Sequence, residues 1–106
     1  MLKKIVAAAL GLTLVAGPVQ AADKMRISLQ LPLKSHLGQN LLVFEKEVEA
    51  RTKGAIDVEI YDSAQLYKDK EVPAAVGSGA IEAGVASLTR YVGDAPVVDV
   101  FYMPFL

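Results

Sequence analysis

Two alternating segments flank one long amphipathic helix near the start of the chain, and this arrangement constrains the fold more than any other feature. In residues 25–31 apolar and polar side chains alternate, which is the period of a half-buried strand. Residues 56–61 alternate in the same way. Between them, apolar residues recur with helical spacing and form one stripe: Leu37, Leu41, Phe44 and Val48. A helical connection of this length predicts a parallel pair of strands with a right-handed crossover.

The ends of this helix carry their own signals. Ser35 is placed to cap the amino end, because its hydroxyl can accept a bond from a free backbone N–H group. Gly54 follows a last turn that contains Arg51 and Lys53, as the carboxyl ends of helices prefer. We therefore expect the helix to lie between Ser35 and Gly54.

The rest of the chain continues the alternation of strand and helix. A shorter helix is expected from about Lys70 to Ser78, with Asp69 as its cap and Pro73 in its first turn. Residues 81–87 are small and apolar enough for a strand packed between layers. The order βαβαβ predicts an α/β fold, namely an open, mostly parallel sheet with helices on both faces.

The first 21 residues have the pattern of a signal peptide. Two lysines precede an uncharged run over residues 5–16, and Gly17-Pro18 then leads to Val19-Gln20-Ala21 as the cleavage site. The apolar run is shorter than the roughly 20 residues that a membrane-spanning helix needs. Cleavage leaves residues 22–106 as one domain and changes the formal charge from −1 to −3, because it removes Lys3 and Lys4.

Composition narrows the compartment and the chemistry. The chain has no cysteine, so neither a disulfide nor a lipidated thiol is available, and we expect an exported, periplasmic monomer. An acidic chain offers no basic patch for nucleic acid. His36 is the only histidine, which excludes a His-rich metal site, and no residues are spaced as a catalytic triad. We therefore expect neither a cofactor nor an enzymatic activity.

Polar residues gather where strands end and helices begin. In open parallel sheets, ligands bind beyond the carboxyl ends of the strands, which here are residues 30–36, 62–69 and 87–91. Arg90 offers a planar fork that suits a carboxylate, although a purely superficial role is equally open. The candidate residues at these loops are Gln30, Lys34, Ser35, His36, Asp69, Ser87, Arg90 and Tyr91.

Several segments, in order, resemble the solute-binding subunit of TRAP (tripartite ATP-independent periplasmic) transporters. The segments are FEKEVEARTKGAIDVEIYDSAQL (44–66), an acid at position 69, GSGAIEAGVAS (77–87) and VFYMPFL (100–106). This resemblance implies part of the first lobe of a two-lobed periplasmic binding protein. Such a receptor captures a small organic anion, for example a C4-dicarboxylic acid, and delivers it to a small and a large membrane subunit driven by an ion gradient.

The same resemblance implies a ligand-binding set. Gln30 would line the pocket, Asp69 would lie near the cleft, Ser87 would replace a ligand-contacting residue, and Arg90 would lie near the hinge side of the site. Tyr91, which follows Arg90, completes the expected ligand-binding set through its loop position alone. The sequence departs from the family pattern at three positions, which are Asp62, Tyr67 and Pro73.

The apolar run over residues 97–106 is typical of a core element and leads us to expect a truncated fragment. The arginine that usually clamps the substrate carboxylate would then lie beyond Leu106. Two other functions stay open at this point: a binding protein of an ATP-driven importer, and a small secreted enzyme.

Overall fold

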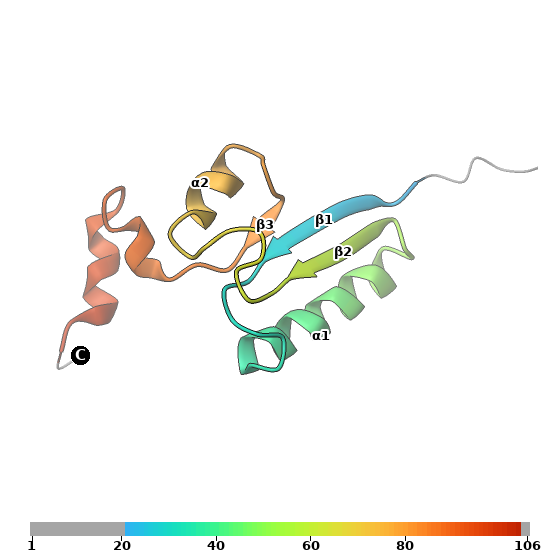
Figure 1. The fold of residues 1–106 in the computed structure, drawn as a ribbon, viewed down its shortest axis with the longest axis horizontal. Helices are drawn as coiled ribbons and strands as arrows, with labels where there is room; N and C mark the ends of the chain where they lie inside the picture. Colours follow the sequence, from blue (N-terminus) through green and yellow to red (C-terminus); the bar gives the residue numbers. More distant parts are fainter. Residues whose placement is uncertain (1–20, 105–106) are drawn as a thin grey trace, which may run out of the picture.

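A computed structural model describes residues 21–104 as three strands, two α-helices and two 3-10 helices (Figure 1). The predicted signal peptide lies outside the described residues apart from Ala21. The elements follow in the order β1 (Asp23–Ser28), α1 (His36–Arg51), β2 (Ile56–Tyr61), α2 (Val72–Gly77), β3 (Ala83–Gly84), η1 (Leu88–Tyr91) and η2 (Pro96–Tyr102).

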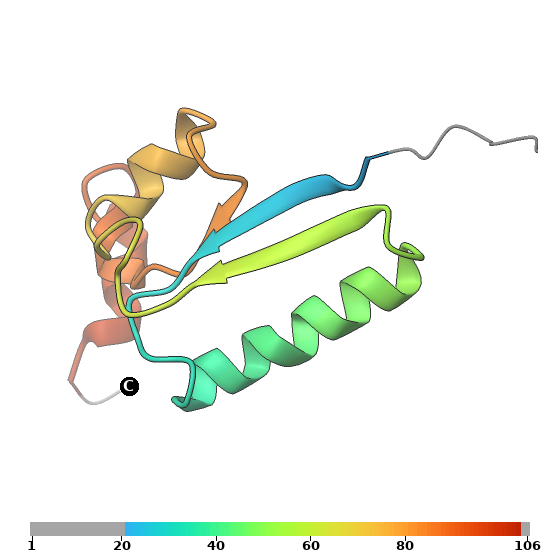
Figure 2. The same cartoon turned by 45° about the vertical axis from the view of Figure 1, so that its right-hand side comes forward.

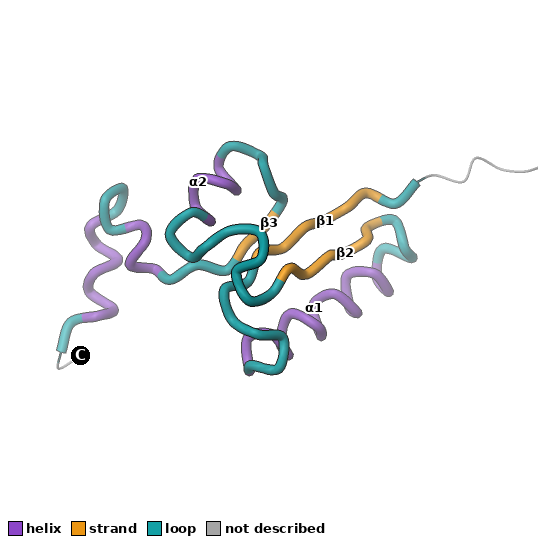
Figure 3. The backbone as a smooth tube through the Cα atoms, viewed as in Figure 1, coloured by secondary structure: helices purple, strands orange, loops and turns teal. Residues whose placement is uncertain are grey.

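The three strands form one parallel sheet in the order β2-β1-β3 (Figure 3). Met25 lies opposite Val58, and Ile27 lies between Ile60 of β2 and Ala83 of β3. The central position of β1 makes it the only strand of the described sheet with neighbours on both edges. The βαβαβ order and the parallel sheet predicted from the sequence are thereby confirmed.

The two α-helices lie on opposite sides of the sheet, with α1 against β2 and α2 against β3 (Figure 2). Ser35 caps α1 as predicted, since its hydroxyl accepts a hydrogen bond of 3.2 Å from the Gly38 N–H. The chain leaves the helix through Gly54, which has a φ of 77° that glycine adopts without strain. None of the helices in residues 21–104 has the length and hydropathy needed to cross a membrane.

The core gathers around the carboxyl-terminal half of β1. Its apolar members are Ile27, Leu29, Val58, Val72, Ala75 and Ile81. Ser28 belongs to the polar face in the alternating pattern, yet it is buried because β1 is the central strand. The Ser28 hydroxyl is satisfied there by donating to the Tyr67 carbonyl at 3.2 Å.

Three predicted boundaries are wrong. β1 ends at Ser28 rather than Leu31, because the carbonyls of Leu29 and Leu31 accept bonds from the turn at residues 63–64 and leave the ladder. β3 contains two residues rather than the seven of 81–87, since the chain bends away after its last ladder bond, from the Val85 N–H to the Ser28 carbonyl.

The third wrong boundary concerns α2, which spans Val72–Gly77 and is not capped by Asp69. Glu71 occupies the cap position without a side-chain bond to the helix, and its carboxylate accepts from the Lys68 N–H instead. The Asp69 carboxylate instead accepts hydrogen bonds from Ser87 and Arg90.

The apolar stripe of α1 is only partly covered. Leu37, Leu41 and Val48 are half-buried, while Phe44 is exposed. Neither 3-10 helix was predicted. η1 and η2 lie away from β1 and β2 in Figure 1 and pack mainly against each other.

Candidate binding site at the carboxyl ends of the strands

Asp69 is the centre of a polar cluster that joins two of the predicted ligand-binding loops. It lies in the loop before α2 and is 9% exposed. One carboxylate oxygen, Oδ1, accepts from the Ser87 N–H at 2.9 Å and from the Ser87 hydroxyl at 3.4 Å. The other, Oδ2, accepts from the Arg90 Nε–H. Asp69 therefore ties the loop before α2 to the segment that follows β3.

The charge state of Asp69 follows from these contacts. Burial would raise the pKa of this carboxyl, because a charged group is poorly solvated there. The hydrogen bonds from Arg90 and Ser87 outweigh burial, so the pKa of Asp69 lies below its ordinary value. The cluster thus holds a carboxylate that is ionised at neutral pH beside a guanidinium.

Arg90 reaches this carboxylate from the last turn of η1 and remains 45% exposed along its side chain. Its Nε atom is occupied by Asp69. Within residues 21–104, its two terminal nitrogens, Nη1 and Nη2, donate no hydrogen bond to another residue. Those two N–H-bearing atoms form one edge of the planar fork, and such an edge matches the two oxygens of a carboxylate.

The other two predicted ligand-binding residues, Gln30 and Tyr91, make no side-chain hydrogen bond to this cluster in residues 21–104. Gln30 directly follows Leu29 at the end of β1 and is half-buried. Tyr91 ends η1 and is 37% exposed. The structure therefore brings together Asp69, Ser87 and Arg90, and it places Gln30 in the loop after β1 and Tyr91 next to Arg90 at the end of η1.

Asp62 holds the loop after β2 in place, although a carboxylate in a loop is usually expected to be solvated. The Asp62 carboxylate accepts from the Leu33 N–H at 3.0 Å and from the Gln65 amide at 3.3 Å. It joins the loop that precedes α1 to the loop that follows β2. No sequence signal pointed to this tie, because Leu33 is 29 residues away.

The remaining candidates at the start of α1 have ordinary structural positions. Ser35 uses its hydroxyl to cap the helix, and Lys34 and His36 are exposed. Across residues 21–104, no three His, Asp or Glu side chains are grouped closely enough to hold a metal ion.

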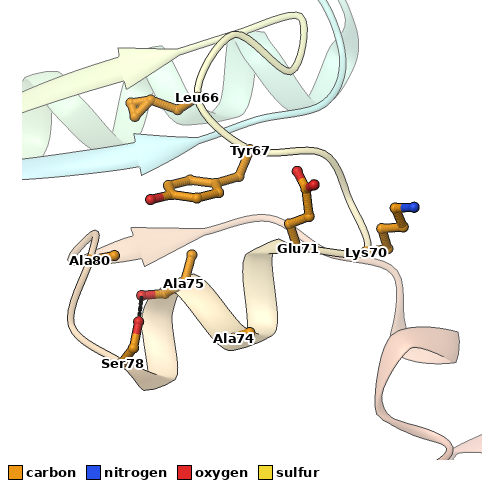
Figure 4. A pocket seen from close by; sticks show the side chains of 8 residues that line it. All are labelled: Leu66, Tyr67, Lys70, Glu71, Ala74, Ala75, Ser78 and Ala80. Carbon is orange, nitrogen blue, oxygen red and sulfur yellow. Dashed lines mark hydrogen bonds between the residues drawn. The ribbon is translucent and has the colours of Figure 1, made fainter.

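An open hollow of about 740 Å³ lies beside α2, and the sequence did not indicate it. Figure 4 shows the Tyr67 ring facing α2, with Lys70 and Glu71 on the loop that leads into that helix. Its lining residues are Leu66, Tyr67, Lys70, Glu71, Ala74, Ala75, Ser78 and Ala80. None of the predicted ligand-binding residues belongs to this lining.

In open parallel α/β sheets, ligands bind beyond the carboxyl ends of the strands, which is where Asp69, Ser87 and Arg90 are joined. Comparison with known proteins agrees: residues 27–106 match the DctP family, described as bacterial extracellular solute-binding protein, family 7. The chain belongs to this family of TRAP solute-binding proteins, which are binding proteins and not enzymes.

Individual relatives support the same assignment. The chain is 41% identical over 71 residues to the C4-dicarboxylate-binding periplasmic protein DctP of Rhodobacter capsulatus. This match covers 65% of this chain and 21% of the relative. An extracytoplasmic solute receptor of Bordetella pertussis that binds pyroglutamic acid is similar in structure, with a TM-score of 0.74 and 28% identity over 78% of this chain.

A third relative is a TRAP periplasmic solute-binding protein of Pseudomonas aeruginosa with bound L-malate. It has a TM-score of 0.74 and 25% identity, and the match covers 79% of this chain. The chain spans only 28% to 29% of the length of these two solved structures. The described fold therefore corresponds to part of one lobe of such a receptor.

Proposed function

We propose that this chain contributes one wall of a carboxylate-binding site in a periplasmic solute-binding protein. The single observation that carries the proposal is Arg90, whose Nε is held by Asp69 while its terminal nitrogens stay unpaired within the described residues. A guanidinium in this state can receive both oxygens of a carboxylate. Its place at the carboxyl edge of a parallel sheet is where such folds bind ligands.

The chemistry of the relatives supports a small organic acid as the solute. L-malate is bound to the relative from Pseudomonas aeruginosa, and the relative from Bordetella pertussis binds pyroglutamic acid. Each of these molecules carries a carboxylate group. In our proposal, Arg90 contacts that group from this lobe and adds to the clamping arginine that the family resemblance implies elsewhere in the receptor. Gln30, Ser87 and Tyr91 complete the wall around it, with Asp69 behind.

The proposed route continues outside this chain. The signal peptide expected over residues 1–21 would export the protein to the periplasm. The solute would then pass to the small and large membrane subunits of a TRAP transporter, which use an ion gradient. The family membership of residues 27–106 supports this route.

Titration calorimetry of the full chain tests the proposal with L-malate, pyroglutamate and their uncharged amides. We expect the carboxylates to bind and the amides not to bind, because the fork of Arg90 recognises the charge and both oxygens. Arg90→Ala should weaken the binding about a hundredfold, since it removes a bidentate, charge-assisted contact but leaves the rest of the wall in place. Arg51→Ala is the matched control, since Arg51 is another arginine but pairs with Glu47 on the outer surface of α1. An affinity that Arg90→Ala leaves unchanged, or that Arg51→Ala lowers equally, would contradict the proposed site.

A further inference from the structure

Asp69 is placed to act on the site without touching the solute. Its side chain is only 11% exposed, so little of its surface is left for another molecule. Both of its oxygens already accept hydrogen bonds within the chain, from Ser87 and from Arg90. A solute at the edge of the sheet would therefore meet Arg90 before it met Asp69.

The same contacts determine how Arg90 is presented. A free arginine side chain has many rotamers, and a solute that binds it has to offset the entropy of fixing one of them. Asp69 holds the Nε–H of Arg90 and leaves the edge formed by Nη1 and Nη2 for another partner. It also binds the Ser87 N–H, three positions before Arg90, so that the backbone and the guanidinium are fixed by one carboxylate.

We propose that Asp69 is a positioning residue, which orients Arg90 so that its Nη1–Nη2 edge faces the carboxylate of the solute. The inference rests on the proposed function, because it assumes that Arg90 receives the solute. It differs from a direct ligand contact by Asp69, and it also differs from a role for Asp69 as a simple counter-charge.

The counter-charge role makes the opposite prediction. A negative charge beside Arg90 repels an incoming anion, so removal of that charge alone should strengthen the binding of a carboxylate. If orientation dominates, removal of Asp69 should weaken the binding, because Arg90 then loses its fixed geometry. The sign of the change in affinity separates the two roles.

The experiment is a double-mutant cycle on the full chain, with L-malate as the probe and calorimetry as the measurement. We expect Asp69→Asn to weaken malate binding about tenfold, the scale of one charge-assisted hydrogen bond. In the Arg90→Ala background, Asp69→Asn should cause no further loss of malate affinity, because the side chain that Asp69 orients is no longer there. Asp69→Glu, which keeps the charge one methylene further out, should recover part of the affinity.

Asp62→Asn is the matched control. Asp62 also joins two loops at this edge of the sheet, through Leu33 and Gln65, but it contacts no cation. The control should leave malate binding within about twofold of the wild-type value, since an asparagine oxygen can still accept the Leu33 bond and no guanidinium loses its partner.

A second readout follows Arg90 directly. In NMR spectra, the Nε–H signal of Arg90 should be shifted and slowed in exchange by its bond to Asp69, and Asp69→Asn should abolish both effects. Asp62→Asn should preserve them. The Ser87 amide signal reports whether each variant keeps the fold, because an asparagine oxygen can still accept that bond.

Each outcome decides one question. Tighter malate binding by Asp69→Asn, an unchanged affinity, or full additivity with Arg90→Ala would overturn the positioning role. An Nε–H signal that Asp69→Asn leaves unchanged would also overturn it, whatever malate does. If the wild-type chain binds no carboxylate while the Nε–H signal behaves as expected, the proposed function fails and the orientation of Arg90 by Asp69 stands.

Discussion

The carboxyl end of β1 and the segment Pro96–Tyr102 are both rich in apolar residues, but only the first is a core. Leu29 at the end of β1 is fully buried, and the loops around it are joined by side-chain bonds from Asp62 and Asp69. In η2, Val97 is 75% exposed and Phe101 is 72% exposed. The hydrogen bonds within this segment run between backbone groups of the same turn.

The contrast shows that burial is decided by neighbours and not by hydropathy. Residues on β1 acquire partners on the strands at both of its edges, because the parallel crossovers place β1 in the centre. η2 packs chiefly against η1, so its apolar side chains have little to contact in the described chain. An apolar run therefore predicts a core element only where the topology brings other elements to it.

The largest expected effect comes from removing a buried side chain at the carboxyl end of β1. Leu29→Ala should destabilise the chain by about 2–5 kcal/mol, since it removes a fully buried side chain and leaves a cavity. Val97→Ala is the control and should change the free energy of unfolding by no more than about 0.5 kcal/mol. Urea denaturation of both variants checks this. Equal losses for the two would mean that η2 belongs to the same cooperative core.

Two glycines provide the next comparison. A Cβ at Gly84 in β3 would overlap the side chain of Val72, which is buried and has little room to move. Gly84→Ala should therefore cost about 1–3 kcal/mol of stability.

The matched variant is Gly93→Ala, where no atom lies within 4 Å of the new Cβ. It should leave stability unchanged or raise it slightly, because alanine restricts the unfolded chain. Thermal melts of the two variants measure the difference. A Gly84→Ala variant as stable as the wild type would show that β3 is not packed against α2.

The smallest expected effect is the loss of folding stability at acidic pH. The Glu82 carboxylate accepts from Arg26, both from its guanidinium at 2.8 Å and from its backbone N–H at 2.9 Å. These bonds lower the pKa of Glu82 to about 2 from its ordinary value of 4.5. Because the folded pKa is the lower one, the contribution is fully present above about pH 4.5 and is lost as the pH falls towards 2.

Asp69 acts in the same direction, since its pKa is also lowered. Chemical denaturation between pH 7 and pH 3 should therefore show stability falling with acid in the wild type and falling less in Glu82→Gln. Both residues belong to the sheet and its edge, not to η2. An acid dependence that Glu82→Gln leaves unaltered would assign the loss to other carboxyl groups.

The sequence predicted the features that depend on neighbours in the chain. The strand at residues 56–61, the helix between Ser35 and Gly54 and the Ser35 cap were predicted from local patterns, and each appears in the structure. The burial that those patterns predicted is only partly present, because β2 is half-buried along most of its length and Phe44 of the α1 stripe is exposed. The parallel order follows from them, because a long helical crossover allows little else.

The rest depends on contacts between distant residues. Asp69 precedes a helix, which is where a capping residue is expected, but its carboxylate binds Ser87 and Arg90, 18 and 21 residues away. The short β3 reflects the same contacts, since the chain turns off the sheet to bring Ser87 to Asp69. Local periodicity carries no signal for either feature. The ligand-binding role of Gln30, Asp69, Ser87, Arg90 and Tyr91 remains a prediction.

The most direct measurement of the central claim is an NMR titration of the full chain with L-malate, followed through backbone amides. We predict that the signals of Gln30, Ser87 and Tyr91, at the carboxyl edge of the sheet, shift progressively as malate is added. Ser78 beside the hollow at α2 and Asp57 at the opposite end of the sheet should not shift. Shifts concentrated at Ser78 or Asp57, with Gln30, Ser87 and Tyr91 unmoved, would contradict the account.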